Sequence, residues 1–340
     1  MDRPLVSVSM AFVRGMVAGL QRRGQPVDAF LEEAGIDAAL LQETSARVTG
    51  EQYVTLFRLL VHRLEDDGLA FYSRALRPGS FRLIVQSGLG APSLEVGMRR
   101  IARTFNLLQD DVALVPVRDG HLAGWALHFS GDALAQPHFM HEMLLRIYWL
   151  LLGWLVAHRL PAVRFDLAFD EPPYAGSYRT VLPAPIRFGQ AHSAFWIDAQ
   201  ALQEPVRRDL KALQLFMTDV QWNIVLPRRK DDDVVVRVRT LLQAAGPTWP
   251  GLSETAEALH MSVSTLQRHL ASEGTTFQAL KDDLRRDLAI SRLIASAVPL
   301  AELAAELGFS DSAAFQRAFK SWTGSPPGAY RRKPGASARP

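Results

Sequence analysis

Two groups of polar side chains near the C-terminus have the residue types and spacing of a surface that reads DNA bases. Gln267 and Arg268 recur as Gln316 and Arg317, 49 residues further along the chain. Glutamine can form two hydrogen bonds with adenine, and arginine can form two with guanine. The pattern therefore favours recognition of a base sequence.

The repeat also covers the elements that must hold these side chains. Residues 266–270 are echoed by 315–319, and each copy follows a short helical segment, at 253–259 and at 300–307. A tight turn and a hydroxyl residue then open a second helix in each copy. We expect Ser253 to cap the first helix, and Ser262 and Ser310 to cap the second helix of their copies. This order predicts two helix-turn-helix units.

The apolar stripes of the second helices decide which side chains stay exposed. Leu266 and Leu270 stand one helical turn apart in the first copy, and Phe315, Phe319 and Trp322 form the stripe of the second. The exposed set is then Ser264, Thr265, Gln267 and Arg268, and Ser312, Ala313, Gln316 and Arg317. An ordinary solvated helix face is the alternative for any one residue, but two related faces disfavour it for the set. Because Ala313 has no polar group, we expect sharper specificity from the first copy.

A helical pattern over residues 276–295 joins the two copies. A rigid connector of this kind fixes the separation of the reading helices. Two successive insertions into the major groove, ~34 Å apart, are the expected result.

Catalytic and metal-binding patterns are weak by comparison. His138, His141 and Glu142 share a helical segment, but a zinc protease motif needs two histidines four residues apart with glutamate after the first. We find no phosphate-binding glycine loop and no nucleophile-elbow motif. The chain has no cysteine, which excludes disulfides, thiolate zinc fingers and a cysteine nucleophile. The sequence therefore predicts a protein that is not an enzyme and needs no metal or cofactor.

Bulk composition limits location and size. The 340 residues suffice for two domains, and 48% apolar with 21% charged residues is typical of globular proteins. The most apolar run, residues 143–156, is shorter than the ~20 residues needed to span a bilayer. Residues 5–20 lack the features of a secretory signal. We expect a cytoplasmic protein without membrane contact.

Charge is distributed unevenly along the chain. Residues 227–340 carry 16 Lys and Arg against 12 Asp and Glu, whereas the remainder carries 22 against 23. The basic excess in the C-terminal third favours a polyanionic partner. The charged run at 227–233 follows a proline and predicts a linker, although a charged loop inside one domain is the alternative. The predicted division is a sensing and dimerisation domain at 1–226, the linker at 227–233, a DNA-binding domain at 234–332 and a disordered tail at 333–340.

The region before the linker mixes helical and strand patterns. Helical spacing occurs at 6–23, 51–64, 93–108, 137–159, 174–182 and 202–224, and strand patterns at 112–117, 122–130, 163–169, 186–188 and 194–197. The predicted fold class is thus an α+β N-terminal effector domain followed by an all-α double helix-turn-helix domain.

Ligand-binding candidates gather on or near the apolar helix at 137–159. A small, mostly apolar effector is our hypothesis, because charge is scarce there. The alternative is an aromatic core with exposed arginines. The candidate set is His138, His141, Tyr148, Trp149 and Phe195, with Arg82 or Arg146 as partner of a carboxylate.

Residues 234–332 resemble the AraC/XylS family of transcription regulators. The resemblance is carried by residues 304–320, 324–327 and 330–331, with 261–268 and 273–277 matching the first half. It implies base contacts from the exposed set above, and contacts with the DNA backbone near Ser262, Ser310 and Lys320. His260 departs from the family, which often has glycine there, and a non-glycine residue with positive φ carries some strain.

Residues 10–215 resemble, less specifically, the arabinose-binding-type effector domain of one AraC subgroup. The matching segments are 68–71, 87–94 and 164–188. The subgroup is linked to varied ligands, so the label does not identify a sugar. The resemblance implies a regulator that binds promoter DNA, and activation is expected over repression. The expected partners are RNA polymerase and a second copy of the chain. The alternative is an effector-independent DNA-binding protein whose N-terminal domain only dimerises.

Overall fold

The computed structural model describes residues 6–130, 138–218, 220, 222, 234–246, 248–272 and 275–331. The chain divides into two compact units. The first comprises Met1–Met10, Gly35–Tyr53 and Arg228–Pro340, and the second comprises Ala11–Ala34 and Val54–Pro227. Two N-terminal segments therefore group with the C-terminal region, whereas sequence reasoning placed all of 1–226 together. The expected linker at 227–233 and tail at 333–340 lie outside the described residues.

A five-stranded sheet forms the centre of the second unit, in the order β3-β4-β7-β5-β6. The strands are β3 (Val112–Asp119), β4 (Leu122–Phe129), β5 (Arg164–Asp166), β6 (Ile186–Arg187) and β7 (Ser193–Asp198). Only β5 and β6 pair in parallel among the described strands. The hairpin between β3 and β4 turns at Gly120, whose φ of 59° suits glycine. This hairpin confirms the sequence prediction.

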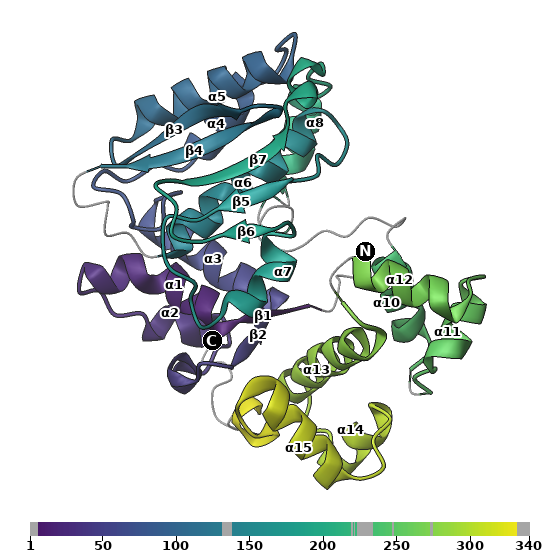
Figure 1. Ribbon diagram of the computed structural model, residues 1–340. Helices are drawn as coiled ribbons and strands as arrows, with labels where there is room; N and C mark the ends of the chain where they lie inside the picture. Colours follow the sequence, from purple (N-terminus) through teal and green to yellow (C-terminus); the bar gives the residue numbers. More distant parts are fainter. Residues whose placement is uncertain are drawn as a thin grey trace. The chain divides into compact units, whose positions relative to one another are not determined.

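Helices cover one face of this sheet (Figure 1). Because Trp125, Phe195 and Phe165 are cross-strand neighbours, they share that face, and all three are fully buried. Trp125 meets Tyr148 with ring centroids 5.3 Å apart, and Phe165 meets Trp149 at 5.7 Å. The helices between residues 10 and 218 are α1 (Met10–Arg22), α2 (Asp28–Glu33), α3 (Gly50–Leu64), α4 (Ser80–Ser87), α5 (Leu94–Leu108), α6 (His138–Leu155), α7 (Tyr178–Val181) and α8 (Leu210–Thr218), with 3-10 turns η3 (Ala175–Ser177) and η4 (Ala199–Gln203); of these, α5 and α6 pack on the strands.

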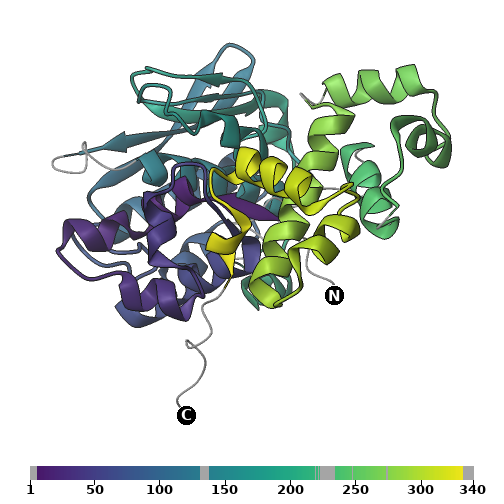
Figure 2. The ribbon, with the colours of Figure 1, turned by 90° about the horizontal axis from the view of Figure 1, so that it is seen from below.

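The described C-terminal part of the first unit consists of six helices and a short 3-10 turn. They are α10 (Val234–Ala244), α11 (Leu252–Ala258), α12 (Val263–Ser272), α13 (Phe277–Ala295), α14 (Leu300–Glu306), α15 (Ser312–Thr323) and η5 (Pro327–Tyr330). We call α11–α12, with the segment from Trp249 that leads into α11, the first helix pair, and α14–α15 with the turn between them the second helix pair. The long helix α13 connects them, as Figures 1 and 2 show in green and yellow. Thr276 caps α13, so the connector predicted at 276–295 is confirmed.

A two-stranded ribbon completes the first unit. β1 (Ser7–Ser9) pairs antiparallel with β2 (Arg47–Thr49), and the 3-10 turn η1 (Ala38–Gln42) precedes β2. Residues 7–9 are thus a strand, where the periodicity of 6–23 predicted helix from its start. The Ser7 hydroxyl donates to the Asp287 carboxylate on α13, and the Arg47 main-chain N–H donates to the Tyr330 hydroxyl at 3.0 Å.

This ribbon buries charge against α13. The Arg47 side chain donates to the Ser7 hydroxyl at 2.7 Å, and burial lowers the Arg47 pKa to about 10. Asp287 also pairs with Arg239 of α10 at 3.3 Å and with Arg286 at 3.1 Å. A buried carboxylate without such partners is costly. The ribbon is therefore an integral part of the first unit.

Candidate nucleic-acid interface and effector site

The first helix of the first pair begins earlier than sequence reasoning placed it. Gly251 is the N-cap of α11, and its N–H donates to the Glu254 carboxylate at 2.7 Å. Ser253 lies inside α11, so its prediction as the cap is wrong. Glycine is acceptable at an N-cap, and the glutamate three residues later satisfies the free N–H of the cap residue.

The second helix of the first pair, α12, begins with a cluster of hydroxyl groups. The Ser262 hydroxyl accepts from the Thr265 main-chain N–H at 3.1 Å, which confirms Ser262 as the cap of α12. The same oxygen lies 3.0 Å from the Ser264 hydroxyl and 2.8 Å from the Thr265 hydroxyl. The two predicted base readers nearest the cap are therefore held in place by it.

The reading helix of the second pair is capped by a different residue. Asp311 accepts from the Ala314 main-chain N–H at 2.7 Å, so the prediction of Ser310 as the cap is wrong. Ser310 instead donates to the Asp311 carboxylate at 3.1 Å. The Ala314 N–H and then the Ser310 hydroxyl hold the pKa of the exposed Asp311 below its usual value. This turn contains one residue more than the first, which moves the cap from the serine to the aspartate.

The two turns share a left-handed backbone residue. His260 has a φ of 57° and Gly308 a φ of 72°. In each turn, the residue after this position donates its N–H to a carbonyl in the preceding helix, Met261 to Ala256 and Phe309 to Ala304. This is the usual way to end a helix in a left-handed residue. The positive φ that sequence reasoning considered for His260 is confirmed.

Most of the residues predicted to contact DNA are exposed to solvent. Leu266, Phe315 and Phe319 are fully buried and Leu270 nearly so, as their stripes predict, whereas Trp322 is half-buried. Opposite these stripes, the exposed members are Ser262, Ser264, Gln267, Arg268, Ser310, Ala313, Gln316, Arg317 and Lys320, and the half-buried ones are Thr265 and Ser312. The fold therefore presents two exposed helix faces that are largely polar.

The predicted effector residues in the second unit are mostly engaged in core contacts. The His141 Nδ1 lies 2.8 Å from the Ser193 hydroxyl, Arg146 donates to the Val181 carbonyl, and Trp149 donates to the Leu160 carbonyl at 2.9 Å. Tyr148 and Phe195 are buried in the aromatic core. His138 stacks on Phe169 at 3.9 Å, while Arg82 is exposed on α4. Their role in ligand binding stays a prediction.

Beside these residues lies a buried carboxylate, Glu142, which the sequence analysis considered only as a metal ligand. Glu142 accepts from the Tyr174 hydroxyl at 2.9 Å and from the Tyr178 hydroxyl. Burial raises the Glu142 pKa to about 7, and burial also lowers the pKa of neighbouring His141 to about 4. Glu142 is thus bonded to two tyrosines, whereas His141 is bonded to Ser193. Within the described residues, no group of three or more His, Cys, Asp or Glu side chains is placed to hold a metal.

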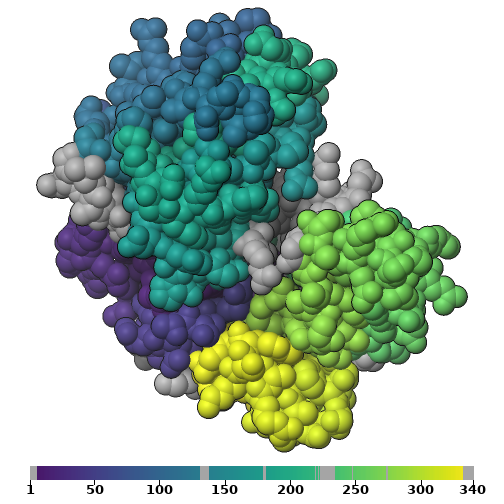
Figure 3. All heavy atoms as spheres, viewed as in Figure 1, coloured from purple at the N-terminus to yellow at the C-terminus, as the bar shows by residue number. Residues whose placement is uncertain are grey.

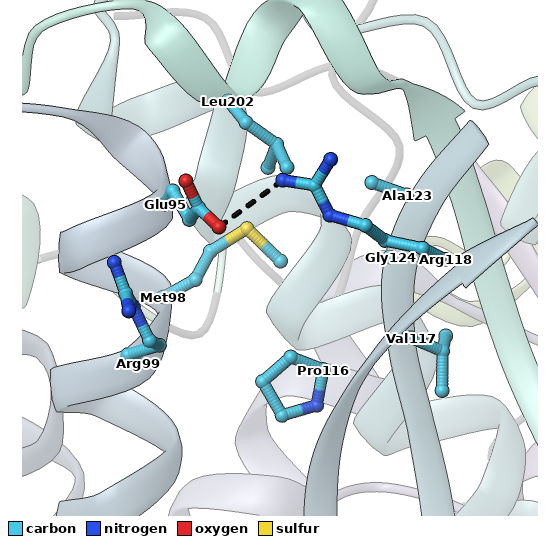
Figure 4. Close-up of a pocket in the computed structure, with 9 residues that line it drawn as sticks. All are labelled: Glu95, Met98, Arg99, Pro116, Val117, Arg118, Ala123, Gly124 and Leu202. Carbon is cyan, nitrogen blue, oxygen red and sulfur yellow. Dashed lines mark hydrogen bonds and ion pairs between the residues drawn. The ribbon is translucent and has the colours of Figure 1, made fainter. Parts of the chain in front are cut away.

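A cleft lies between α5 and the hairpin of β3 and β4 (Figure 4). Its volume is about 290 Å³, and none of the predicted effector residues lines it. Arg118 reaches across it to Glu95 at 3.1 Å, with the side chains of Met98 and Leu202 beside the pair. The full lining is Glu95, Met98, Arg99, Pro116, Val117, Arg118, Ala123, Gly124 and Leu202. The cleft is thus mainly apolar, with two guanidinium groups and one carboxylate.

Comparisons with known proteins agree with this architecture. Residues 24–206 match the arabinose-binding domain of AraC transcription regulators, and residues 255–333 match a helix-turn-helix domain. The chain is 34% identical over 197 residues to the ornithine utilization regulator of Pseudomonas aeruginosa, a match that covers 58% of each chain. It is 28% identical over 323 residues, 92% of each chain, to an uncharacterized HTH-type transcriptional regulator of Mycobacterium tuberculosis.

Among solved structures, the transcriptional regulator CdpR of Pseudomonas aeruginosa matches 97% of this chain and 99% of its own, at 18% identity and a TM-score of 0.34. In the described part of the chain, no helix is long and apolar enough to cross a membrane. The fold and the two family matches define the class of protein. A mixed α/β domain followed by a helix-turn-helix region is typical of DNA-binding transcription regulators, which are not enzymes. The chain belongs to the AraC family of these regulators.

Proposed function

We propose that the protein binds a bipartite site in promoter DNA through the exposed faces of α12 and α15. A small effector bound by the second unit controls this binding. The observation that carries the proposal is the pair of exposed polar faces, Gln267 with Arg268 and Gln316 with Arg317, each backed by a buried stripe. These side chains match the donors and acceptors that base edges present in the major groove.

Binding of the full chain to DNA tests this proposal. A site selected from a random duplex library serves as the probe, and a scrambled duplex measures non-specific affinity. Replacing Gln267 or Gln316 by Ala is expected to reduce the preference for the selected site while leaving scrambled DNA unaffected. Gln278 on α13 offers a matched control, because it is exposed and already bonded to Asp282 at 2.9 Å. A selection that yields no enriched sequence would contradict the proposal.

The cleft beside α5 supports a small, mostly apolar effector that carries a negative charge. Its apolar lining suits an aliphatic or aromatic body, and Arg99 and Arg118 outnumber the single carboxylate of Glu95. A ligand carboxylate can replace Glu95 as the partner of Arg118, since that ion pair is largely exposed and weak. The volume of about 290 Å³ lies near the lower end of known ligand pockets.

A thermal-shift screen of monocarboxylates, amines and sugars tests this choice of effector. Short aliphatic and aromatic carboxylates are expected to raise the melting temperature of the wild type but not that of Arg118→Gln. Arg74 pairs with Asp110 on an exposed surface outside the cleft, so Arg74→Gln is the matched control. Stabilisation by sugars or polyamines alone would reject the proposed ligand class. The name of one relative, an ornithine utilization regulator, makes ornithine a necessary member of the amine set.

Activation is the proposed direction of control, with RNA polymerase and a second copy of the chain as partners. Two copies would place two double helix-turn-helix units on repeated sites. Transcription assays with the effector, and the mass of the full chain in solution, test these points. A monomer that binds its site equally well with every compound would favour the alternative, an effector-independent DNA-binding protein.

A further inference from the structure

The two helix pairs are in direct contact, besides being joined by α13. Trp249 lies just before α11 and is 5% exposed. Its indole Nε1–H donates to the main-chain oxygen of Glu306, the last residue of α14, at 2.9 Å. A side chain of the first pair is therefore bound to the backbone of the second pair across 57 residues of sequence.

An arginine of the connector lies between rings from the two pairs. The guanidinium carbon of Arg285 is 5.3 Å from the centroid of the Trp249 ring and 5.1 Å from that of Phe309. Phe309 stands in the turn of the second pair. The Arg285 Nη2 also donates to the Gly308 carbonyl at 3.4 Å. Guanidinium groups are attracted to aromatic faces within ~6 Å, so one side chain of α13 contacts both pairs.

The surroundings of these three side chains are tightly packed. A Cβ on Gly308 would lie 3.0 Å from Trp249 Cδ1 and 3.1 Å from Arg285 Nη2. Lys281 of α13 donates to the carbonyls of Trp249 and Pro250 at 2.6 and 3.1 Å, which holds the segment that carries the indole. In the space-filling view the green and yellow parts of the C-terminal region, which include these three residues, adjoin one another (Figure 3).

We propose that Trp249, Arg285 and Phe309 form an interpair stack that fixes the separation and angle of α12 and α15. The stack would restrict binding to DNA sites whose two halves have one spacing. This inference rests on the proposed function, since it assumes that both helices read bases. One added base pair moves the second half by ~3.4 Å and turns it by ~35°, which a rigid pair of helices cannot follow.

Selected DNA sites of altered spacing test the interpair stack. The full chain is titrated against the parental site, against versions with one base pair added or removed between the halves, and against each half alone. Trp249→Ala is expected to weaken binding to the parental site by about tenfold, which corresponds to ~1.4 kcal/mol. Its affinity for the altered spacings should change much less, so its spacing preference becomes flatter, and single halves should bind as in the wild type.

Three further variants keep the test decisive. Trp249→Phe retains a ring for Arg285 but loses the indole N–H, so an intermediate spacing preference is expected. Arg285→Gln removes the stacked cation and should act like Trp249→Ala. Arg292→Gln is the matched control, because this half-buried arginine also projects from α13 but binds the Glu306 side chain of α14, at 3.0 Å, and not a ring. This control should keep the wild-type spacing preference.

The outcomes separate the two hypotheses. If folded Trp249→Ala and Arg285→Gln lose affinity equally at every spacing, the interpair stack is rejected. If these variants fail to fold, Trp249→Phe decides the question, and an unchanged spacing preference in it rejects the role of the indole. If Arg268→Ala and Arg317→Ala leave binding to the parental site unchanged, it is the proposed function that fails.

Discussion

The two helix pairs build the same geometry from different residues. The left-handed turn residue is His260 in the first pair and Gly308 in the second. The reading helix is capped by a neutral serine in the first and by a carboxylate in the second. The change of cap follows from one extra residue in the second turn. The residues of such a turn can therefore vary as long as the backbone hydrogen bonds are kept.

The second helices of the two pairs also expose different side chains. The start of α12 exposes hydroxyl groups around Ser262, whereas α15 exposes Ala313 and has the negative charge of Asp311 at its start. We therefore expect the first pair to discriminate bases more strongly. The second pair should contribute more to positioning.

The largest expected effect concerns the cores of the two pairs. Phe315 and Leu266 are both fully buried. Truncation of Phe315 to Ala should cost ~3–5 kcal/mol of unfolding free energy, and truncation of Leu266 to Ala ~2–5 kcal/mol. Urea unfolding followed by circular dichroism measures both. An unchanged midpoint for Phe315→Ala would disprove its place in the core.

The next effect concerns base discrimination. Arg268→Ala should relax preference at one base position by ~1–3 kcal/mol, and Arg317→Ala should have a smaller effect of the same kind. Competition binding with single-base variants of the selected site measures this. Equal losses on selected and scrambled DNA would mean that these arginines contact only phosphates.

A smaller effect separates the two turns. Gly308→Ala should destabilise the protein by ~1–2 kcal/mol from backbone strain alone, with crowding against Trp249 adding to it. His260→Gly should be neutral or stabilising by less than ~1 kcal/mol, because relief of strain is offset by greater freedom of the unfolded chain. Thermal unfolding of the two variants checks the contrast. A His260→Gly variant as unstable as Gly308→Ala would mean that the imidazole has an unrecognised role.

The smallest effect is a difference in pH dependence. The pKa of Asp311 is held below its usual value in the folded chain. Its stabilising contribution is therefore present above the unfolded pKa of ~3.9 and is lost as the pH falls through the lower folded value. The melting temperatures of wild type and Asp311→Ala should differ at pH 6 and converge as the pH falls below the unfolded pKa. Ser262→Ala, which removes a cap that does not titrate, should show no such convergence.

Periodic apolar spacing made the helices and the double helix-turn-helix predictable. The stripe of Leu266 and Leu270 defines α12 without any long-range information, and the same holds for the β3–β4 hairpin. Cap residues were less predictable, because Ser310 and Asp311 are adjacent and both suit the position. The choice depends on the length of the turn.

Long-range contacts could not be predicted from local sequence. The strand at Ser7–Ser9 pairs with Arg47–Thr49 and is bound to α13 through Asp287, 280 residues away. Likewise, the partners of Glu142 are tyrosines 32 and 36 residues later in the chain. Such contacts depend on tertiary packing, and the residue types involved are ordinary surface types when taken alone.

We propose that two unequal reading helices are held at one fixed separation. Selection of bound sites from a random duplex library by the full chain tests it most directly. We predict a motif with two halves about one helical turn apart, with greater base preference in the half that Arg268→Ala disrupts. A motif with a single half, two halves of equal strength, or variable spacing between the halves would contradict the account.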